Sequence, residues 1–220
     1  MHRRITTSIR LLFFLLLLTS LPLHASVEFI EHDMTVTLDP DGATLSVEDT
    51  VKFPDTIRSL EFTLNHGFRI EHSSVKLQTV RHTDTPHRVY RVSLPAGERE
   101  WRVRYQGKPR FSTRRTHGDM PLGALSAQGT YLDGNSAWYP LTGLAIGRLT
   151  LEVRHPAAWR ALSVGRYAGS DGVSRWSTQA PVDDIYLVAG PFTRYHRAHA
   201  GTDLAVWLLQ PDPALAQRDL

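Results

Sequence analysis

Hydrophobic and polar residues alternate along most of the chain that follows residue 26. In the first such stretch, Met34, Val36 and Leu38 share one side, and Thr35 and Thr37 share the other. Successive side chains of a β-strand point to opposite faces, so this alternation predicts a half-buried strand. The turn sequence DPDG follows and alternation then resumes, which predicts an antiparallel hairpin.

The second stretch of this hairpin places Leu45, Val47, Val51 and Phe53 on its apolar side. Asp49 falls on the same side, where a carboxylate breaks the pattern. An edge or bulge position would let this side chain reach water. We favour that interpretation over a functional carboxylate.

Shorter alternating runs recur along the chain between clusters of Pro, Gly, Asp and Asn. They cover residues 60–64, 90–94, 101–105, 149–153 and 185–187. Many short strands separated by turn signals predict an all-β fold, which we expect to be a saddle-like antiparallel β-sandwich. The stretch 107–129 lacks alternation and carries Lys108, Arg110, Arg114 and Arg115, which we interpret as a solvated loop rather than an anion site.

The last part of the chain combines a strand signal with a helix signal. Residues 204–209 read LAVWLL, and after them Asp212 is a candidate N-cap and Pro213 a candidate first helical residue. We therefore expect a β-sandwich domain over residues 26–211. Residues 212–220 are expected to be the start of a truncated helical or catalytic segment.

The first 25 residues have the composition of a secretory signal peptide. They carry three Arg and no acidic residue, followed by the apolar run LLFFLLLL, and Ala25 precedes Ser26 at a passable cleavage site. A membrane-spanning helix needs about 20 apolar residues, and this run is shorter and is followed by Pro22. We expect cleavage between Ala25 and Ser26, contact with the membrane only during export, and a secreted or periplasmic location in a bacterium.

Charge and cysteine content exclude several classes of function. The chain has 25 Lys+Arg and 22 Asp+Glu, and the leader removes three Arg, so 22 residues of each sign remain. A formally neutral mature chain gives no reason to expect nucleic-acid binding. The absence of Cys excludes disulfides, thiolate zinc ligands and a cysteine nucleophile.

Motifs for catalysis or metal binding are missing from the sequence. There is no H-E-x-x-H, no G-x-S-x-G and no glycine-rich phosphate loop. His196 and His199 are three residues apart in a strand or loop, where this spacing does not place both on one face. Asp183 and Asp184 are neighbours that would point to opposite faces of a strand. We therefore expect no catalytic residue and no metal site in this chain.

Aromatic residues are the remaining candidate for ligand binding. Trp138, Trp159 and Trp176 could form a platform for stacking sugars, as tryptophans do in some secreted β-sandwiches. Each also lies near alternating apolar residues, and tryptophan is mostly buried in folded proteins. We favour core packing for all three.

Several stretches, taken in order, resemble one family of enzymes. They are HDMTVTLDPDGATLSVEDTVKFP, then GTYLDGNSAWYP with LTLEVRHPAAWRALSVGR, then PVDDIYLVAGPFTRYH, and finally DPALAQRDL. Together they resemble the N-terminal β-domain of the aminopeptidase N family of zinc metallopeptidases, the gluzincins. The resemblance extends over residues 31–220.

The resemblance implies a saddle-like β-domain that lies beside a thermolysin-like catalytic domain. In complete members that catalytic domain carries G-x-M-E-N, H-E-x-x-H and a later Glu ligand, and none of these occurs here. Zinc is therefore expected only in a complete family member, and no cofactor is expected in this chain. The family's β-domain usually lends a Gln or Glu that holds the free amino group of the substrate, and Gln128 is the nearest candidate for this role.

The expectation is a non-catalytic, exported N-terminal domain that shapes a peptide-binding cleft. Its partners would be the catalytic domain of the same protein and the peptide substrate. The alternative is a stand-alone periplasmic β-sandwich that binds a peptide or a carbohydrate. An independent enzyme has the least support, because no motif indicates one.

Overall fold

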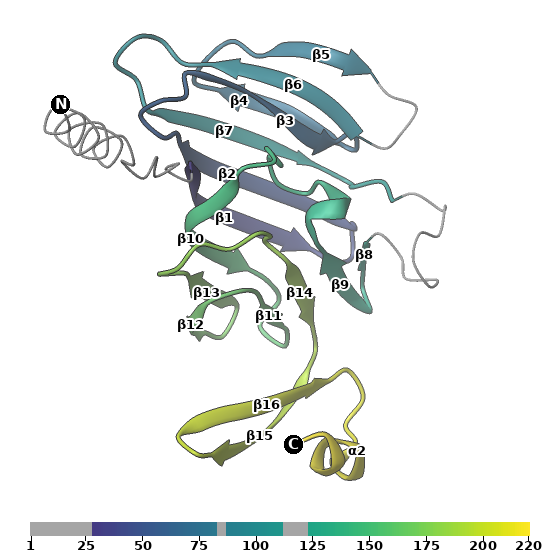
Figure 1. The fold of residues 1–220 in the computed structure, drawn as a ribbon. Helices are drawn as coiled ribbons and strands as arrows, with labels where there is room; N and C mark the ends of the chain where they lie inside the picture. Colours follow the sequence, from purple (N-terminus) through teal and green to yellow (C-terminus); the bar gives the residue numbers. More distant parts are fainter. Residues whose placement is uncertain (1–27, 83–86, 112–122) are drawn as a thin grey trace, which may run out of the picture.

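The computed structural model describes residues 28–82, 87–111 and 123–220, and nearly all of its regular structure is β-strand (Figure 1). The largest sheet has seven strands. In order across the sheet they are β12 (Arg166–Ser170), β13 (Val173–Ser177), β10 (Ala145–Arg154), β1 (Phe29–Asp39), β2 (Thr44–Lys52), β7 (Glu100–Gly107) and β4 (Phe68–Ser73). All neighbours in this sheet run antiparallel except β1 and β10, which run parallel.

Three smaller sheets complete the described fold. One has the order β3 (Ser59–Asn65), β6 (His87–Ser93), β5 (Gln78–His82), and another the order β11 (Arg160–Leu162), β14 (Leu187–Gly190), β9 (Gly129–Leu132), β8 (Ala124–Ser126). The last is the hairpin β15 (Thr193–His199) and β16 (Thr202–Leu208). A short 3₁₀ helix covers Gly134–Ser136, and α2 covers Pro213–Asp219.

The core lies between the seven-stranded sheet and the sheets that contain β3 and β9. Met34 and Val36 of β1 are buried, whereas Asp33 and Thr37 on the other face are exposed. One continuous hydrophobic cluster joins these apolar side chains to residues from both smaller sheets. The predicted all-β sandwich is therefore confirmed. Apolar and polar residues alternate along its strands because one face of each sheet is buried and the other is exposed to solvent.

The predicted first hairpin is confirmed in detail. β1 and β2 pair antiparallel from Glu31↔Lys52 to Asp39↔Thr44. In the turn, the Gly42 amide donates to Asp39 Oδ1 at 3.1 Å, which is the local side-chain bond that favours Asp before a turn. The loop expected at 107–129 does contain a short strand, β8, and residues 112–122 within it lie outside the described part.

The interpretation of Asp49 as an edge or bulge residue is wrong. β2 lies between β1 and β7, and its register is regular on both sides at this position. Asp49 is buried in the interior of the sandwich, at 2% exposure. Its carboxylate is kept there by a partner on the neighbouring strand, described below.

The C-terminal elements form a lobe at the lower end of Figure 1. β15 and β16 pair with each other, and α2 lies against β16. The predicted N-cap is confirmed, because Asp212 Oδ1 accepts from the Leu215 amide at 2.9 Å and Pro213 begins the helix. The expected domain boundary at residues 211–212 stays a prediction, and the predicted signal peptide with its Ala25–Ser26 cleavage site lies outside the described residues. Within the described ranges, no helix is long and apolar enough to cross a membrane.

Candidate functional site

The turn between β8 and β9 places Gln128 at the surface. Ala127 and Gln128 form the tip of this hairpin, and both are exposed. The Gln128 amide donates to Ser126 Oγ at 3.3 Å, and the same hydroxyl donates to the Gly129 carbonyl at 3.3 Å. The backbone of the turn is thereby fixed, while the carboxamide of Gln128 extends from it. Gln128 thus lies directly before β9, and its contact with substrate stays a prediction.

Beyond β9, Asp133 organises the 3₁₀ helix. Its Oδ1 accepts from the Ser136 amide at 3.2 Å, and its Oδ2 accepts from Asn135 Nδ2 at 3.1 Å. Tyr131 also donates to Oδ2, at 3.3 Å. Partial burial and the negative charge of Asp133 raise the pKa of Tyr131. Asp133 is thus the N-cap of the 3₁₀ helix, and its carboxylate oxygens accept hydrogen bonds from residues close to it in the sequence.

Asp184 ties this helix to the loop that precedes β14. Its Oδ2 accepts from the Gly134 amide at 3.0 Å, and its Oδ1 accepts from the Tyr139 hydroxyl at 2.8 Å. Burial and the nearby Asp184 charge raise the pKa of Tyr139, so this phenol remains a hydrogen-bond donor. Asp183 and Asp184 lie in a loop rather than in the strand the sequence suggested.

Trp138 is a packing anchor in the interior. It is 0% exposed, its Nε1 donates to the Ile185 carbonyl at 2.9 Å, and its own carbonyl accepts from Tyr105 Oη at 3.0 Å. Trp159 is also buried, and Trp176 is half-buried, with Nε1 donating to the Ala161 carbonyl. The preference for core packing is confirmed for Trp138 and Trp159, and Trp176 packs partly buried against the same core.

Beneath this segment lies a buried ion pair that the sequence did not reveal. His32 Nδ1 and Asp49 Oδ2 are 2.8 Å apart, and both side chains are 0% exposed. The ring of Tyr139 packs edge-on against His32, with centroids 5.8 Å apart. His32 and Asp49 lie on the apolar faces of neighbouring strands, with His32 opposite Val51 and Asp49 opposite Met34. The sequence signal for this pair was one polar residue within the apolar face of each strand.

The described residues hold no group of three or more His, Cys, Asp or Glu side chains that could bind a metal ion. His196 pairs with Asp203 instead, with Nδ1 to Oδ1 at 3.1 Å. Within the described residues, the side chains present therefore do not fit a zinc centre. The site therefore offers a hydrogen-bonded scaffold around Asp133 and Asp184, with the exposed Gln128 at its margin.

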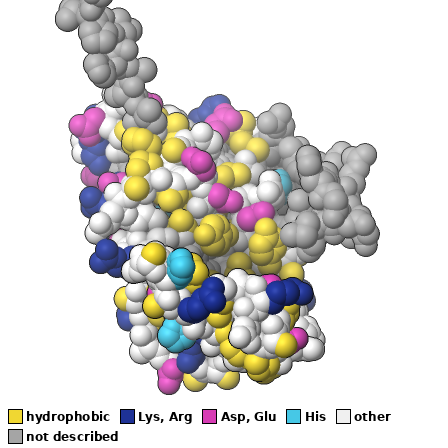
Figure 2. All heavy atoms as spheres, turned by 60° about the horizontal axis from the view of Figure 1, so that its bottom comes forward, with side chains coloured by type: hydrophobic (Ala, Val, Ile, Leu, Met, Phe, Trp, Pro, Cys, Tyr) yellow, Lys and Arg dark blue, Asp and Glu magenta, His cyan; other side chains and the backbone are white. Residues whose placement is uncertain are grey.

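The lower end of the molecule presents apolar surface beside charged groups (Figure 2). Exposed apolar side chains of the C-terminal lobe include Leu204 of β16 at 37% and Leu209 directly after it at 50%. In Figure 2, acidic side chains lie among hydrophobic ones on the face above the C-terminal lobe, and basic and His side chains gather on the lobe itself. Exposed apolar residues beside charge are typical of surfaces that contact another polypeptide.

Comparisons with known proteins bear on the fold. No protein-family model and no curated protein matches the sequence. Among solved structures, an M1 zinc metallopeptidase from Deinococcus radiodurans matches with a TM-score of 0.56 and 20% identity, over 81% of this chain and 46% of that one. Leukotriene A4 hydrolase from Saccharomyces cerevisiae matches with a TM-score of 0.52 and 10% identity, over 78% of this chain and 30% of that one.

The chain therefore spans less than half the length of either structure. The resemblance to the β-domain of this family is confirmed at the level of the fold. The described residues form a β-domain with the fold found in M1 zinc metallopeptidases.

Proposed function

We propose that the chain is the exported, non-catalytic N-terminal β-domain of an aminopeptidase-like zinc metallopeptidase. In the complete enzyme it forms one wall of the peptide cleft and helps to select substrates with a free N-terminus. The observation that carries the proposal is the fold match, which covers most of this chain and less than half of the M1 structure. The described residues hold no metal-binding group, which fits a role beside a catalytic segment rather than in place of it.

Gln128 is the residue that we propose contacts the substrate. A free N-terminus is an ammonium group, and a carboxamide oxygen accepts a hydrogen bond from it without adding charge. The hairpin around Ser126 holds the Gln128 backbone, so the side chain would be presented at a fixed point. This role follows from the resemblance and from exposure, and it requires the catalytic segment to face this turn.

The C-terminal lobe supports the proposed partner. An isolated two-stranded ribbon is marginal in water, and β15–β16 pairs with no further strand among the described residues. Leu204 and Leu209 are exposed on and directly after β16. The proposed catalytic segment of the same protein would cover these side chains and extend the lobe.

The test is a Gln128→Ala variant in a protein that joins this chain to a gluzincin catalytic segment. Loss of a hydrogen bond to a charged group should raise KM for unblocked peptides by about tenfold or more. Gln179→Ala is a matched control, because Gln179 is also exposed and lies outside this hairpin. An unchanged KM in the Gln128→Ala protein would exclude the proposed contact.

The wider proposal has its own test. The 220-residue chain alone, incubated with zinc and alanine 4-nitroanilide, should release no nitroaniline. Release that depends on zinc would show an independent enzyme and overturn the assignment. Export is checked separately, by mass spectrometry of the mature product, which should begin at Ser26.

A further inference from the structure

An open groove of about 720 Å³ lies at the mouth between two sheets. One wall is β4, the last strand of the seven-stranded sheet, and the other is formed by β5, β6 and the residues that lead into β5. β5 is likewise the last strand of its own sheet. Among the described residues, the groove is therefore bordered by two strand edges.

The lining of the groove shows that it runs along the edge of β4. Every residue from Phe68 to Ser73 borders it. Successive side chains of a strand point to opposite faces, so a groove beneath one face would meet only alternate residues. A groove that meets all of them exposes the backbone of the edge, and unpaired edge groups are a template for another strand.

The opposite wall carries an apolar strip, formed by Val75, Leu77 and Tyr90, beside Lys76, Thr79 and Arg88. Tyr90 stacks on the core residue Phe62, with ring centroids 5.3 Å apart. The buried Val92 lies on the same face of β6 as Tyr90. Val75 and Leu77 are partly buried against the same core. A strand added beside β4 would pack against these side chains. The seven-stranded sheet would then extend to the sheet formed by β3, β6 and β5.

The groove has an excess of positive charge. Glu71 already receives hydrogen bonds from Arg69 at 2.9 Å and from Gln106 at 2.6 Å. Lys76 and Arg88 also line the groove, and neither forms an ion pair with the residues that the structure describes. Two uncompensated cations beside an apolar wall favour an occupant with carboxylates and apolar side chains.

We propose that this groove binds an extended, acidic segment of another protein as an additional strand on β4. The segment would alternate apolar side chains, packed under Tyr90 and Leu77, with carboxylates near Lys76 and Arg88. Pairing would begin along Phe68–Ile70, ahead of the register shift between Ile70 and His72. The site is separate from Gln128, so it holds whether or not the peptidase assignment is correct.

The test uses the isotope-labelled 220-residue chain and two designed peptides. Acetyl-Glu-Val-Glu-Val-Glu-amide is the acidic probe, and acetyl-Lys-Val-Lys-Val-Lys-amide is its matched opposite. The acidic peptide should shift the amide resonances of β4 and slow their hydrogen exchange, because new backbone hydrogen bonds form there. The basic peptide should do neither.

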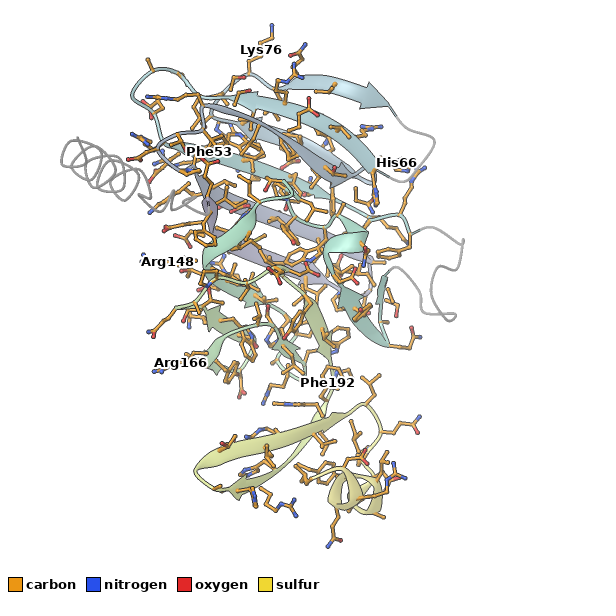
Figure 3. The ribbon with its side chains drawn as sticks, in the orientation of Figure 1. Phe53, His66, Lys76, Arg148, Arg166 and Phe192 are labelled. Atoms are coloured by element: carbon orange, nitrogen blue, oxygen red, sulfur yellow. The ribbon has the colours of Figure 1, made fainter. Side chains whose placement is uncertain are left out.

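Reversing the charge of the two basic residues tests whether they recognise the acidic peptide. Lys76→Glu with Arg88→Glu should weaken binding of the acidic peptide about tenfold, as expected for two partly exposed ion pairs made repulsive. Arg166→Glu is the control, because Arg166 begins β12, at the other edge of the seven-stranded sheet from β4, and lies far from Lys76 (Figure 3). Lys76 is exposed, so Lys76→Glu alone remains a valid test if the double variant does not fold.

Three results would overturn the proposal. Equal affinity for the two peptides would contradict recognition by charge. Resonance shifts confined to residues outside β4 would contradict the pairing of the peptide with this strand. Affinity that is unchanged by charge reversal at Lys76 and Arg88 would place the bound peptide elsewhere.

Discussion

At the scale of single residues, the interior depends on polar side chains whose partners come from distant parts of the chain. His32 and Asp49 form a fully buried hydrogen-bonded pair, with His32 Nδ1 and Asp49 Oδ2 2.8 Å apart. His155 and Ser174 form another, with Nε2 to Oγ at 2.8 Å. His155 Nδ1 lies 3.0 Å from the Pro156 carbonyl, which can only accept, so Nδ1 carries the proton and Ser174 donates to Nε2.

Removal of Asp49 should be strongly destabilising. Asp49→Ala leaves His32 buried without its partner, and the free energy of unfolding should fall by about 3–5 kcal/mol in urea titrations. Glu48→Ala is the control on the same strand, exposed on the opposite face, and should cost at most about 0.5 kcal/mol. Replacement of both partners by Leu should recover much of the loss. If Asp49→Ala were as mild as Glu48→Ala, the pair would have no structural role.

Because of His155, the folded chain should become less stable in mild acid. Burial lowers its pKa from the ordinary value of 6.5, and the nearby positive charge of Arg160 adds to this effect against the opposing Pro156 carbonyl. Between the native pKa and 6.5 the unfolded chain binds more protons, so stability is full above pH 6.5 and declines below it. The free energy of unfolding should be lower at pH 5.5 than at pH 7.5.

The variant His155→Gln separates this contribution from that of other groups. Burial also lowers the pKa of His87, so part of the pH dependence should remain in the variant. A pH profile of His155→Gln that is identical to that of the unaltered chain would assign the whole decline to other groups.

At the scale of elements, the strands differ sharply in how much surrounds them. β1 and β2 lie in the middle of the seven-stranded sheet, with neighbours on both sides and a core beneath. Among the described residues, β15 pairs with β16, α2 lies against β16, and most side chains of the two strands are exposed. A ribbon with few buried contacts opens at low free-energy cost.

Hydrogen exchange should report this difference. Backbone amides of β15 and β16 should exchange within seconds to minutes, whereas those of β1 and β2 should stay protected far longer, because they open only with the whole sandwich. Exchange mass spectrometry on the chain measures both regions at once. Protection of the ribbon equal to that of β1 would indicate that a partner surface, such as a second copy, covers it.

At the scale of the whole molecule, one hydrophobic core connects the seven-stranded sheet with the sheets that contain β3 and β9. Trp101, Trp138 and Trp159 lie in this core and report on its hydration. Strand content and tryptophan burial should therefore be lost together.

Unfolding of the sandwich should thus be a single transition. Far-ultraviolet circular dichroism and tryptophan fluorescence should give the same midpoint in urea, as expected for an all-or-none loss of one core. Midpoints that differ would show that one of the smaller sheets unfolds separately.

The sequence predicted the strands well because alternation is a local signal. β1, β2 and β7 appear where Met34, Val47 and Val103 alternate with polar residues, and the Asp212 N-cap appears where composition indicates it. The order of strands was not predictable, because strands from different sheets carry the same alternating pattern. The bonds to Asp184 and the His32 partner of Asp49 were missed for a related reason. Each depends on which strands or loops meet, and no local pattern encodes that.

The parallel pairing of β1 with β10 has a consequence for how the chain reaches its fold. Phe29 pairs with Ala145, roughly half the chain away, whereas β1 and β2 are joined by a short turn. Closing so long a loop is slow. The β1–β2 hairpin should therefore form early, and β10 should pair with β1 later. During that interval the outer side of β1 is an unpaired edge, open to the wrong partner. β1 is thus synthesised before the other described strands and is among the last to be completed, so kinetic competition between folding and aggregation should centre on it.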